Sequence, residues 1–195
     1  EAIRLNPEYA ASYNNRGAVY DKSGHYENAF EDYNTAIRLK PEYADAYNNR
    51  GLVFARLGQN QKAIADFSKA ISLNPIFVDA YNNRVVVYSA QGRYDLAVSD
   101  LNKAISANPD SLKSYINRAA IYAKLNQYEE VARNLTEVIR LQPDNDLFYY
   151  NRGFAYARIG QYADAINDFN KAIRLKDNYA DAYNIRAAVY LNQHN

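Results

Sequence analysis

An all-α protein built from repeated pairs of helices is predicted by three features of this 195-residue sequence. The first is a fixed period of 34 residues, which returns a tyrosine at Tyr13, Tyr47, Tyr81, Tyr115, Tyr149 and Tyr183. The second is the helical spacing of the apolar residues within each period. The third is a helix-stopping residue at two fixed places between the apolar runs. Together these features predict full repeats over residues 10–43, 44–77, 78–111, 112–145 and 146–179.

Partial repeats occupy residues 1–9 and 180–195, so the sequence starts and stops inside a repeat. We therefore expect residues 1–195 to form a single array that was cut from a longer one. We number the positions of a repeat from its first residue, which makes the recurring tyrosine position 4. Positions 1, 4, 8 and 11 predict one face of a first helix, and positions 17, 20, 24, 27 and 28 predict one face of a second helix.

Two positions of each repeat are expected to end its helices. Position 15, between the first and second helix, holds residues that accept the left-handed conformation at a helix end, namely Gly24, Gly58, Gly92, Asn126 and Gly160. Position 32 is proline at residues 41, 75, 109 and 143, which ends the second helix and is expected to pre-set the start of the next one. Asn6, Asn74 and Asn108 precede a proline, and we expect them to cap the helix that follows.

Composition argues against several classes of function. The 23 Lys and Arg residues nearly balance 22 Asp and Glu, and the net charge of +1 predicts no nucleic-acid or membrane partner. No apolar run approaches the ~18 residues of a membrane span. Cysteine is absent and His25 and His194 are the two histidines, so neither a metal site nor a cofactor is expected. No signal peptide opens the sequence, and we expect a cytoplasmic protein.

Catalysis is not predicted, because no nucleophile–base pair recurs and no phosphate-binding motif is present. The repeated pattern Y-x-N-R-G-x6-G-x-Y-x2-A-x2-D-F-x2-A-I-x-L-x-P instead resembles the tetratricopeptide repeat, in a variant with Arg at position 7. The resemblance covers essentially the whole sequence. It implies a right-handed superhelical solenoid of antiparallel helix pairs, in which the first helices line a concave groove. It also implies a non-enzymatic scaffold for protein–protein interaction.

Position 7 places an arginine on the core-facing arc of each first helix. An unpaired charge there would be costly, and the candidate partner is the acid at position 23 of the second helix. We therefore predict four structural ion pairs, Arg16–Asp32, Arg50–Asp66, Arg84–Asp100 and Arg152–Asp168. An acid of the adjacent repeat is an open alternative for each arginine. A row of anion-binding sites is the competing interpretation, which we disfavour because the acids are built in.

Asparagine is a mediocre residue inside a helix, so its recurrence on the first helices needs a reason. Position 6 holds Asn15, Asn49, Asn83, Asn117 and Asn151, and position 5 holds Asn14, Asn48 and Asn82. An amide can both donate to and accept from the backbone of an extended peptide. A similar asparagine row lines the peptide-binding tetratricopeptide groove of O-GlcNAc transferase. We expect a peptide-binding groove, and the alternative is that the amides only link neighbouring repeats.

The groove is expected to have charged rims and one apolar anchor. The basic rim comprises Lys22, Arg56, Lys124 and Arg158, and the acidic rim comprises Asp45 and Asp79. Tyr150 and Phe154 make the fifth repeat the most apolar stretch and the candidate for holding a partner side chain. The alternative to peptide binding is self-association, because the exposed ends of an uncapped array, with Tyr183, Ala187 and Tyr190 at one of them, are expected to favour a homo-oligomer.

Overall fold

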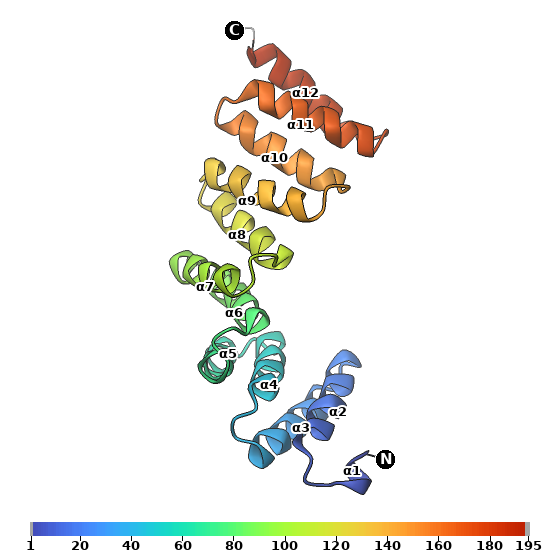
Figure 1. Ribbon diagram of the computed structural model, residues 1–195, viewed down its shortest axis with the longest axis vertical. Helices are drawn as coiled ribbons and strands as arrows, with labels where there is room; N and C mark the ends of the chain where they lie inside the picture. The colour runs from blue at the N-terminus through green and yellow to red at the C-terminus, as the bar shows by residue number, and fades with distance from the viewer. Residues whose placement is uncertain (1, 194–195) are drawn as a thin grey trace. The chain divides into compact units, whose positions relative to one another are not determined.

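The computed structural model describes residues 2–193 and is helical throughout this range, without strands (Figure 1). His194 lies outside the described residues. A short helix, α1 (Ala2–Leu5), precedes the first full repeat. The remaining helices are α2 (Ala10–Lys22), α3 (Tyr26–Leu39), α4 (Ala44–Arg56), α5 (Asn60–Leu73), α6 (Val78–Ala90), α7 (Tyr94–Ala107), α8 (Leu112–Lys124), α9 (Tyr128–Leu141), α10 (Asp146–Arg158), α11 (Tyr162–Leu175) and α12 (Ala180–Gln193). The all-α helix-pair fold predicted from the period is confirmed.

The chain divides into two compact blocks, residues 1–108 and 109–195. The N-terminal block contains α1 to α7, and the C-terminal block contains α8 to α12. Within each block, the two helices of a repeat pack against each other, and the second helix also packs against the first helix of the next repeat. A second helix is therefore covered on both sides wherever a further repeat follows it inside the block.

The turn between the two helices of a repeat is set by one residue in the left-handed region. Gly24 has a φ of 79°, and Asn126 is the one non-glycine among the described residues with a positive φ, at 57°. The next N–H reaches back to a carbonyl in the last turn of the first helix, as His25 does to Tyr20 at 2.9 Å. This closure satisfies a carbonyl that the helix end would leave unpaired. The role predicted for position 15 is confirmed.

The predicted caps at Asn6, Asn74 and Asn108 are wrong. The first helices begin at position 1 of each repeat, so the capping places fall on other residues, such as Tyr43 before α4 and Phe77 before α6. The Oδ1 atom of Asn74 instead accepts from the backbone N–H of Ile76 at 3.3 Å, and Asn6 makes the same contact with Glu8 at 3.2 Å. The asparagine thus stabilises the turn around the proline, because its side chain reaches a backbone donor two residues on.

Close packing inside a repeat depends on position 8 of the first helix. A Cβ atom added at Gly51 would lie 2.8 Å from Cε1 of Phe67, so glycine is what lets the ring at position 24 seat against the helix backbone. Gly17 with Tyr33 and Gly153 with Phe169 repeat this arrangement. The repeats with a larger residue at position 8 carry leucine at position 24, as in the pairs Val85–Leu101 and Ala119–Leu135.

Candidate functional site

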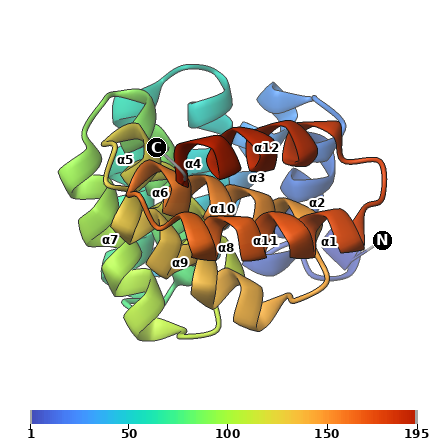
Figure 2. The ribbon, with the colours of Figure 1, turned by 90° about the horizontal axis from the view of Figure 1, so that it is seen from above.

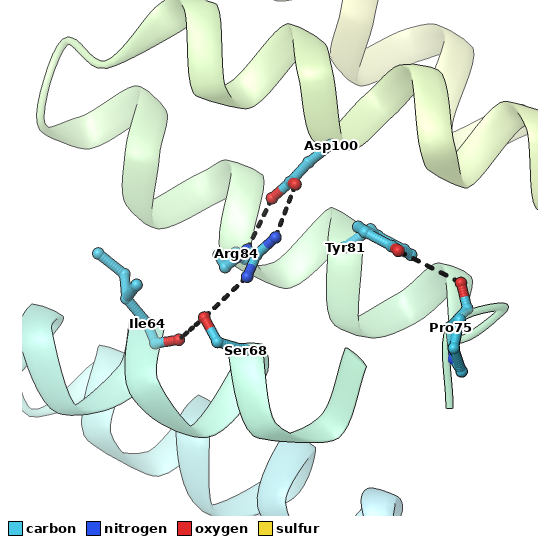
Figure 3. Close-up of polar contacts among 6 residues, drawn as sticks. All are labelled: Ile64, Ser68, Pro75, Tyr81, Arg84 and Asp100. Atoms are coloured by element: carbon cyan, nitrogen blue, oxygen red, sulfur yellow. Dashed lines mark hydrogen bonds and ion pairs between the residues drawn. The ribbon is translucent and has the colours of Figure 1, made fainter. Parts of the chain in front are cut away.

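Arg84 is held between two helices of different repeats in the N-terminal block (Figure 3). Its Nε and Nη2 atoms each donate to one carboxylate oxygen of Asp100 at 2.7 Å, in a bidentate pair. Its Nη1 atom donates to the Ser68 hydroxyl at 2.7 Å, and that hydroxyl donates onward to the Ile64 carbonyl at 2.6 Å. The same view shows the Tyr81 hydroxyl donating to the Pro75 carbonyl at 3.2 Å. One guanidinium thereby ties α6 to both α7 and α5.

The other arginines at position 7 follow this pattern. Arg16, Arg50 and Arg152 make the bidentate contact with the acid of their own repeat, at 2.7 to 2.8 Å. The acids so bound are Asp32, Asp66 and Asp168. Arg118 donates to Asn134 at 2.7 Å, because the fourth repeat has an amide in place of the acid. The pairs lie within repeats rather than between them.

The contact to the preceding repeat was missed by sequence analysis. Nη1 of Arg50 donates to Asn34 at 2.6 Å, Nη1 of Arg152 donates to Thr136 at 3.1 Å, and Nη1 of Arg186 donates to Asn170. All of these acceptors occupy position 25, which holds Asn34, Ser68, Asn102, Thr136 and Asn170. A small hydrogen-bonding side chain at every position 25, directly after the buried position 24, is the signal that identifies this contact.

Aromatic rings enclose the arginines on the remaining sides. The guanidinium carbon of Arg84 lies 6.0 Å from the ring centre of Tyr81 and 5.6 Å from that of Tyr88. The hydrogen bond to Asp66 raises the pKa of Arg50 above its usual value, and this effect exceeds the lowering that burial causes. Both edges of the guanidinium group are engaged within the protein in Arg50, Arg84 and Arg152. The geometry therefore supports a structural role for the row.

The asparagines of the N-terminal block form a ladder of amide contacts, which we call the amide ladder. Nδ2 of Asn49 donates to Oδ1 of Asn14 at 3.0 Å, and Nδ2 of Asn83 donates to Oδ1 of Asn48 at 2.9 Å. Each bond joins position 6 of one repeat to position 5 of the preceding repeat. Asn82 is fully buried, and its amide donates to the Val78 carbonyl at 2.9 Å. Position 5 thus lies inside the wall of first helices.

Position 6 lies at the surface of the same helices. Asn15 is exposed, whereas Asn49 and Asn83 are half-buried and retain access to solvent. In the C-terminal block Asn117 is half-buried and Asn151 is exposed. That block does not repeat the ladder at α10, because position 5 of the preceding repeat is Ile116 and offers no amide to Asn151. The amide-to-amide bonds from Asn49 and Asn83 lie in the N-terminal block.

The two predicted anchor residues of the fifth repeat contact other parts of the C-terminal block. The ring of Tyr150 stacks on Tyr179 with centres 5.0 Å apart and lies 5.9 Å from the ring of Phe169. The ring of Phe154 meets Tyr128 edge to face at 6.2 Å. Both aromatic side chains are half-buried, so part of their apolar surface is already used by the fold.

The predicted basic and acidic rims are exposed, but the arginines among them have internal contacts. Arg56 forms an ion pair with Asp21 of the preceding repeat. The guanidinium of Arg158 lies 4.6 Å from the ring centre of Tyr128. Lys22, Lys124, Asp45 and Asp79 lie on exposed stretches of the first helices.

Neither a membrane span nor a metal site is found among residues 2–193. None of the helices there has the length and apolar character needed to cross a bilayer. In the same range no group of three or more His, Asp or Glu side chains is placed to hold a metal ion.

Family models match almost the whole sequence. Models described as TPR repeat match residues 22–58 and 119–160, and models described as tetratricopeptide repeat match residues 1–31, 44–77, 78–111, 101–131 and 147–179. The chain belongs to the tetratricopeptide repeat family. Its fold is therefore that of a protein–protein interaction scaffold, a class that is generally non-enzymatic. No curated protein sequence matches the chain significantly.

Several solved structures share the fold at low sequence identity. YrrB, described as a TPR protein with an unusual peptide-binding site, aligns with a TM-score of 0.75 at 22% identity, over 95% of this chain and 96% of its own. MamA from Desulfovibrio magneticus RS-1 aligns at 0.73 and 22% identity, over 88% and 97%. TTC0263, a thermophilic TPR protein from Thermus thermophilus, aligns at 0.63 and 19% identity, over 93% and 99%.

Proposed function

We propose that this tetratricopeptide chain is a non-enzymatic scaffold that binds an extended peptide segment of a partner protein on the first helices of its N-terminal block. The amide ladder is the observation that carries the proposal. Asn49 and Asn83 each donate one amide N–H to the preceding repeat, and this hydrogen bond fixes the direction in which the rest of the amide points. The remaining N–H and the carbonyl oxygen, which in Asn49 also accepts from Nδ2 of Asn48 at 3.4 Å, match the acceptor and donor of a peptide backbone.

Preorganisation is the physical advantage of this arrangement. A free asparagine side chain would lose rotamer freedom on binding a ligand, and that loss would weaken the complex. The hydrogen bond to the preceding repeat restricts the side chain before the ligand arrives. In this proposal the buried position-5 residues Asn14, Asn48 and Asn82 support the ligand contacts rather than make them. YrrB, with its peptide-binding site, offers a precedent for such a role within the fold.

Recognition through amides predicts tolerance of the ligand's side chains. The backbone of an extended peptide repeats regularly whatever its sequence, so a row of amides recognises an extended backbone and the direction in which it runs. Specificity then comes from the exposed charges on either side, including Lys22 and Asp45, which favour a segment of complementary charge pattern. Ligands selected by the chain should accordingly share charge placement more than any apolar motif.

The proposal is tested with peptides selected from a displayed random library against the full chain. Substitution of Asn15, Asn49 and Asn83 together by Ala should weaken the selected peptides about tenfold or more, because charge-neutral hydrogen bonds of about 1 kcal/mol are lost in series. Calorimetric titration measures the loss, and circular dichroism verifies that the variant remains helical. N-methylation of alternate backbone amides in the peptide should weaken binding in the same way.

Asn28→Ala is the matched control, since Asn28 is an exposed asparagine on α3 of the same block. Its binding should equal that of the unaltered chain. Unchanged affinity in the triple variant would contradict peptide capture by these amides and favour a purely structural role for the ladder.

A further inference from the structure

A cavity of about 380 Å³ lies between the first and second full repeats of the N-terminal block. The helices that border it pack in succession, α3 against α4 and α4 against α5, and both ribbon views show this order (Figures 1 and 2). Its lining comes from the start of α3, the end of α4 with the turn that follows, and the start of α5. A cavity of this volume is at the lower end of the range for ligand sites, which suits one long side chain.

Two aromatic rings form a corner of this cavity. The rings of Phe30 and Phe54 have centres 5.4 Å apart and planes inclined at 67°. Phe54 belongs to a buried hydrophobic cluster against which Phe30 packs, so the corner is in place before a ligand arrives. The face of an aromatic ring attracts cations. The Phe54 ring shows this attraction within the chain, since the Arg50 guanidinium lies 5.8 Å and the Lys62 ammonium 5.4 Å from its centre.

Two carboxylates stand beside the aromatic corner. Glu27 and Glu31 line the cavity and lie one helical turn apart on α3, which places them on the same face of that helix. Within the described range 3–192 neither carboxylate forms an ion pair, although Lys62 lines the same cavity. The cavity therefore combines ring faces with an excess of negative charge, and both features are complementary to a cationic guest.

The equivalent cleft of the C-terminal block has a different character. It lies between the fourth and fifth repeats, has a volume of about 240 Å³, and has Ala132 and Arg133 at the places of Phe30 and Glu31. Arg133 forms an ion pair with Glu130 at 2.9 Å, so a cation of the chain is already present there. Phenylalanine at position 21 followed by glutamate occurs in the first repeat alone. The helix-pair fold thus supplies a cleft, and the side chains of the first repeat suit it to a cation.

We propose that the cavity between the first and second repeats binds an arginine side chain of a partner protein. The guanidinium stacks in the corner made by Phe30 and Phe54. Its edges donate to the carboxylates of Glu27 and Glu31, because a planar guanidinium can stack on a ring and hydrogen-bond to carboxylates at the same time. Lys62 is exposed and forms no ion pair among the residues described, so the incoming group displaces its ammonium from the Phe54 ring.

Arginine fits this combination better than lysine does. An ammonium group is more strongly hydrated than a guanidinium, and it lacks the planar fork that engages two carboxylate groups while a ring is stacked on its face. The site uses no asparagine of the amide ladder, so it is independent of the proposed peptide site.

The test uses the full chain and single amino acids that are acetylated at the amino group and amidated at the carboxyl group. Nuclear magnetic resonance titration with the arginine derivative should shift the amides of residues 26–31 and 57–62 selectively. A dissociation constant on the order of 5 mM is expected, because one side chain makes few contacts. The citrulline derivative has nearly the same shape without the charge and should bind about tenfold more weakly. The lysine derivative should bind about threefold more weakly.

Variants of the chain separate the carboxylates from the rings. Glu27→Gln combined with Glu31→Gln should weaken binding of the arginine derivative about tenfold, because two charge-assisted hydrogen bonds become neutral ones. Glu8→Gln combined with Glu42→Gln is the matched control, since both residues are exposed in the same block and lie outside the cavity lining. Phe30→Ile introduces the residue that the second repeat has at this position and should weaken binding about threefold.

Lys62→Ala tests the displacement step. It should strengthen binding of the arginine derivative about twofold, because it removes a competing ammonium from the Phe54 ring. Added salt should weaken the arginine derivative and leave the citrulline derivative almost unaffected, since only the first is held by charge. Substitution of Asn15, Asn49 and Asn83 together by Ala should leave the affinity for the arginine derivative unchanged, which distinguishes this site from the ladder.

Several outcomes would overturn the proposal. They are equal binding of the arginine and citrulline derivatives, unchanged affinity in the double variant of Glu27 and Glu31, and shifts that map outside the cavity. A trimethyllysine derivative that binds more tightly than the arginine derivative would also overturn it and would assign the cavity to a methylated ammonium group. Because the altered ligands leave the protein unchanged, their results stand whether or not the protein variants fold.

Discussion

Arg84 and Arg16 make the same bidentate contact in different surroundings. The Arg84 side chain is 13% exposed, and the Arg16 side chain is 47% exposed. Solvent screens an ion pair strongly at the surface and weakly in the interior. The contribution of the ion pair to the free energy of unfolding should therefore depend on which repeat contains it.

Replacement of the acid measures this difference. Asp100→Ala leaves a buried guanidinium without its carboxylate and should lower the free energy of unfolding by about 3–5 kcal/mol. Asp32→Ala should lower it by at most about 1 kcal/mol, since Arg16 regains water. Urea denaturation followed by circular dichroism provides both values, with the exposed Asp95→Ala in α7 as control. Equal losses at Asp100 and Asp32 would refute the dependence on burial.

Spacing along the sequence identified the acids but left two candidate partners for each arginine. The acid of the same repeat and that of the adjacent repeat have the same residue type and similar helical phase, so only the packing distance distinguishes them. Tyr150 illustrates a different limit. Its place in the period put it on the groove, whereas its ring stacks on Tyr179, which a one-dimensional pattern does not encode.

At the scale of the helix pair, position 8 and position 24 act as one unit. Gly51 gives the Phe67 ring its seat, and repeats with a larger residue at position 8 carry leucine opposite. Helix ends at position 15 were predictable because left-handed backbone favours glycine so strongly. Helix starts were not, since the asparagine that precedes three of the five prolines suits a cap and a turn equally by residue type.

Gly51→Ala tests the coupling within a pair. The added methyl group should destabilise the chain by about 1–3 kcal/mol, because the Phe67 ring and the helix backbone are both fixed. Phe67→Leu in the same chain should recover much of this loss by recreating the Ala119–Leu135 combination. Thermal denaturation of the single and double variants measures the interaction. Additive losses in the double variant would show that the two positions are independent.

For the whole molecule, the period runs without interruption through residue 108, so it gives no sign of the division into two blocks. The division follows from how helices contact each other, which depends on side-chain detail at each junction. The fold class, by contrast, was accessible from the sequence because the same pattern is copied in every repeat. Copying strengthens a weak local signal until the helix pairs are unmistakable.

Removal of one whole repeat tests whether the junctions are interchangeable. Deletion of residues 44–77 brings Arg84 opposite Asn34, the partner that Arg50 uses in the intact chain. The shortened chain should remain fully helical per residue and unfold cooperatively at a lower temperature. Deletion of residues 44–60, half a period, should instead abolish cooperative unfolding because it places the wrong helix faces together. Circular dichroism with thermal scans distinguishes the two.

Arg50 reaches its acid 16 residues ahead and its amide 16 residues behind, and Arg152 reaches its acid and its hydroxyl over the same spans. These contacts do not depend on how many repeats follow in the chain. A gene that encodes such a chain can gain or lose segments of 34 codons by unequal recombination. At each new junction the arginine at position 7 can form the same contacts with positions 23 and 25. The number of repeats can therefore change while the contacts inside the array are kept.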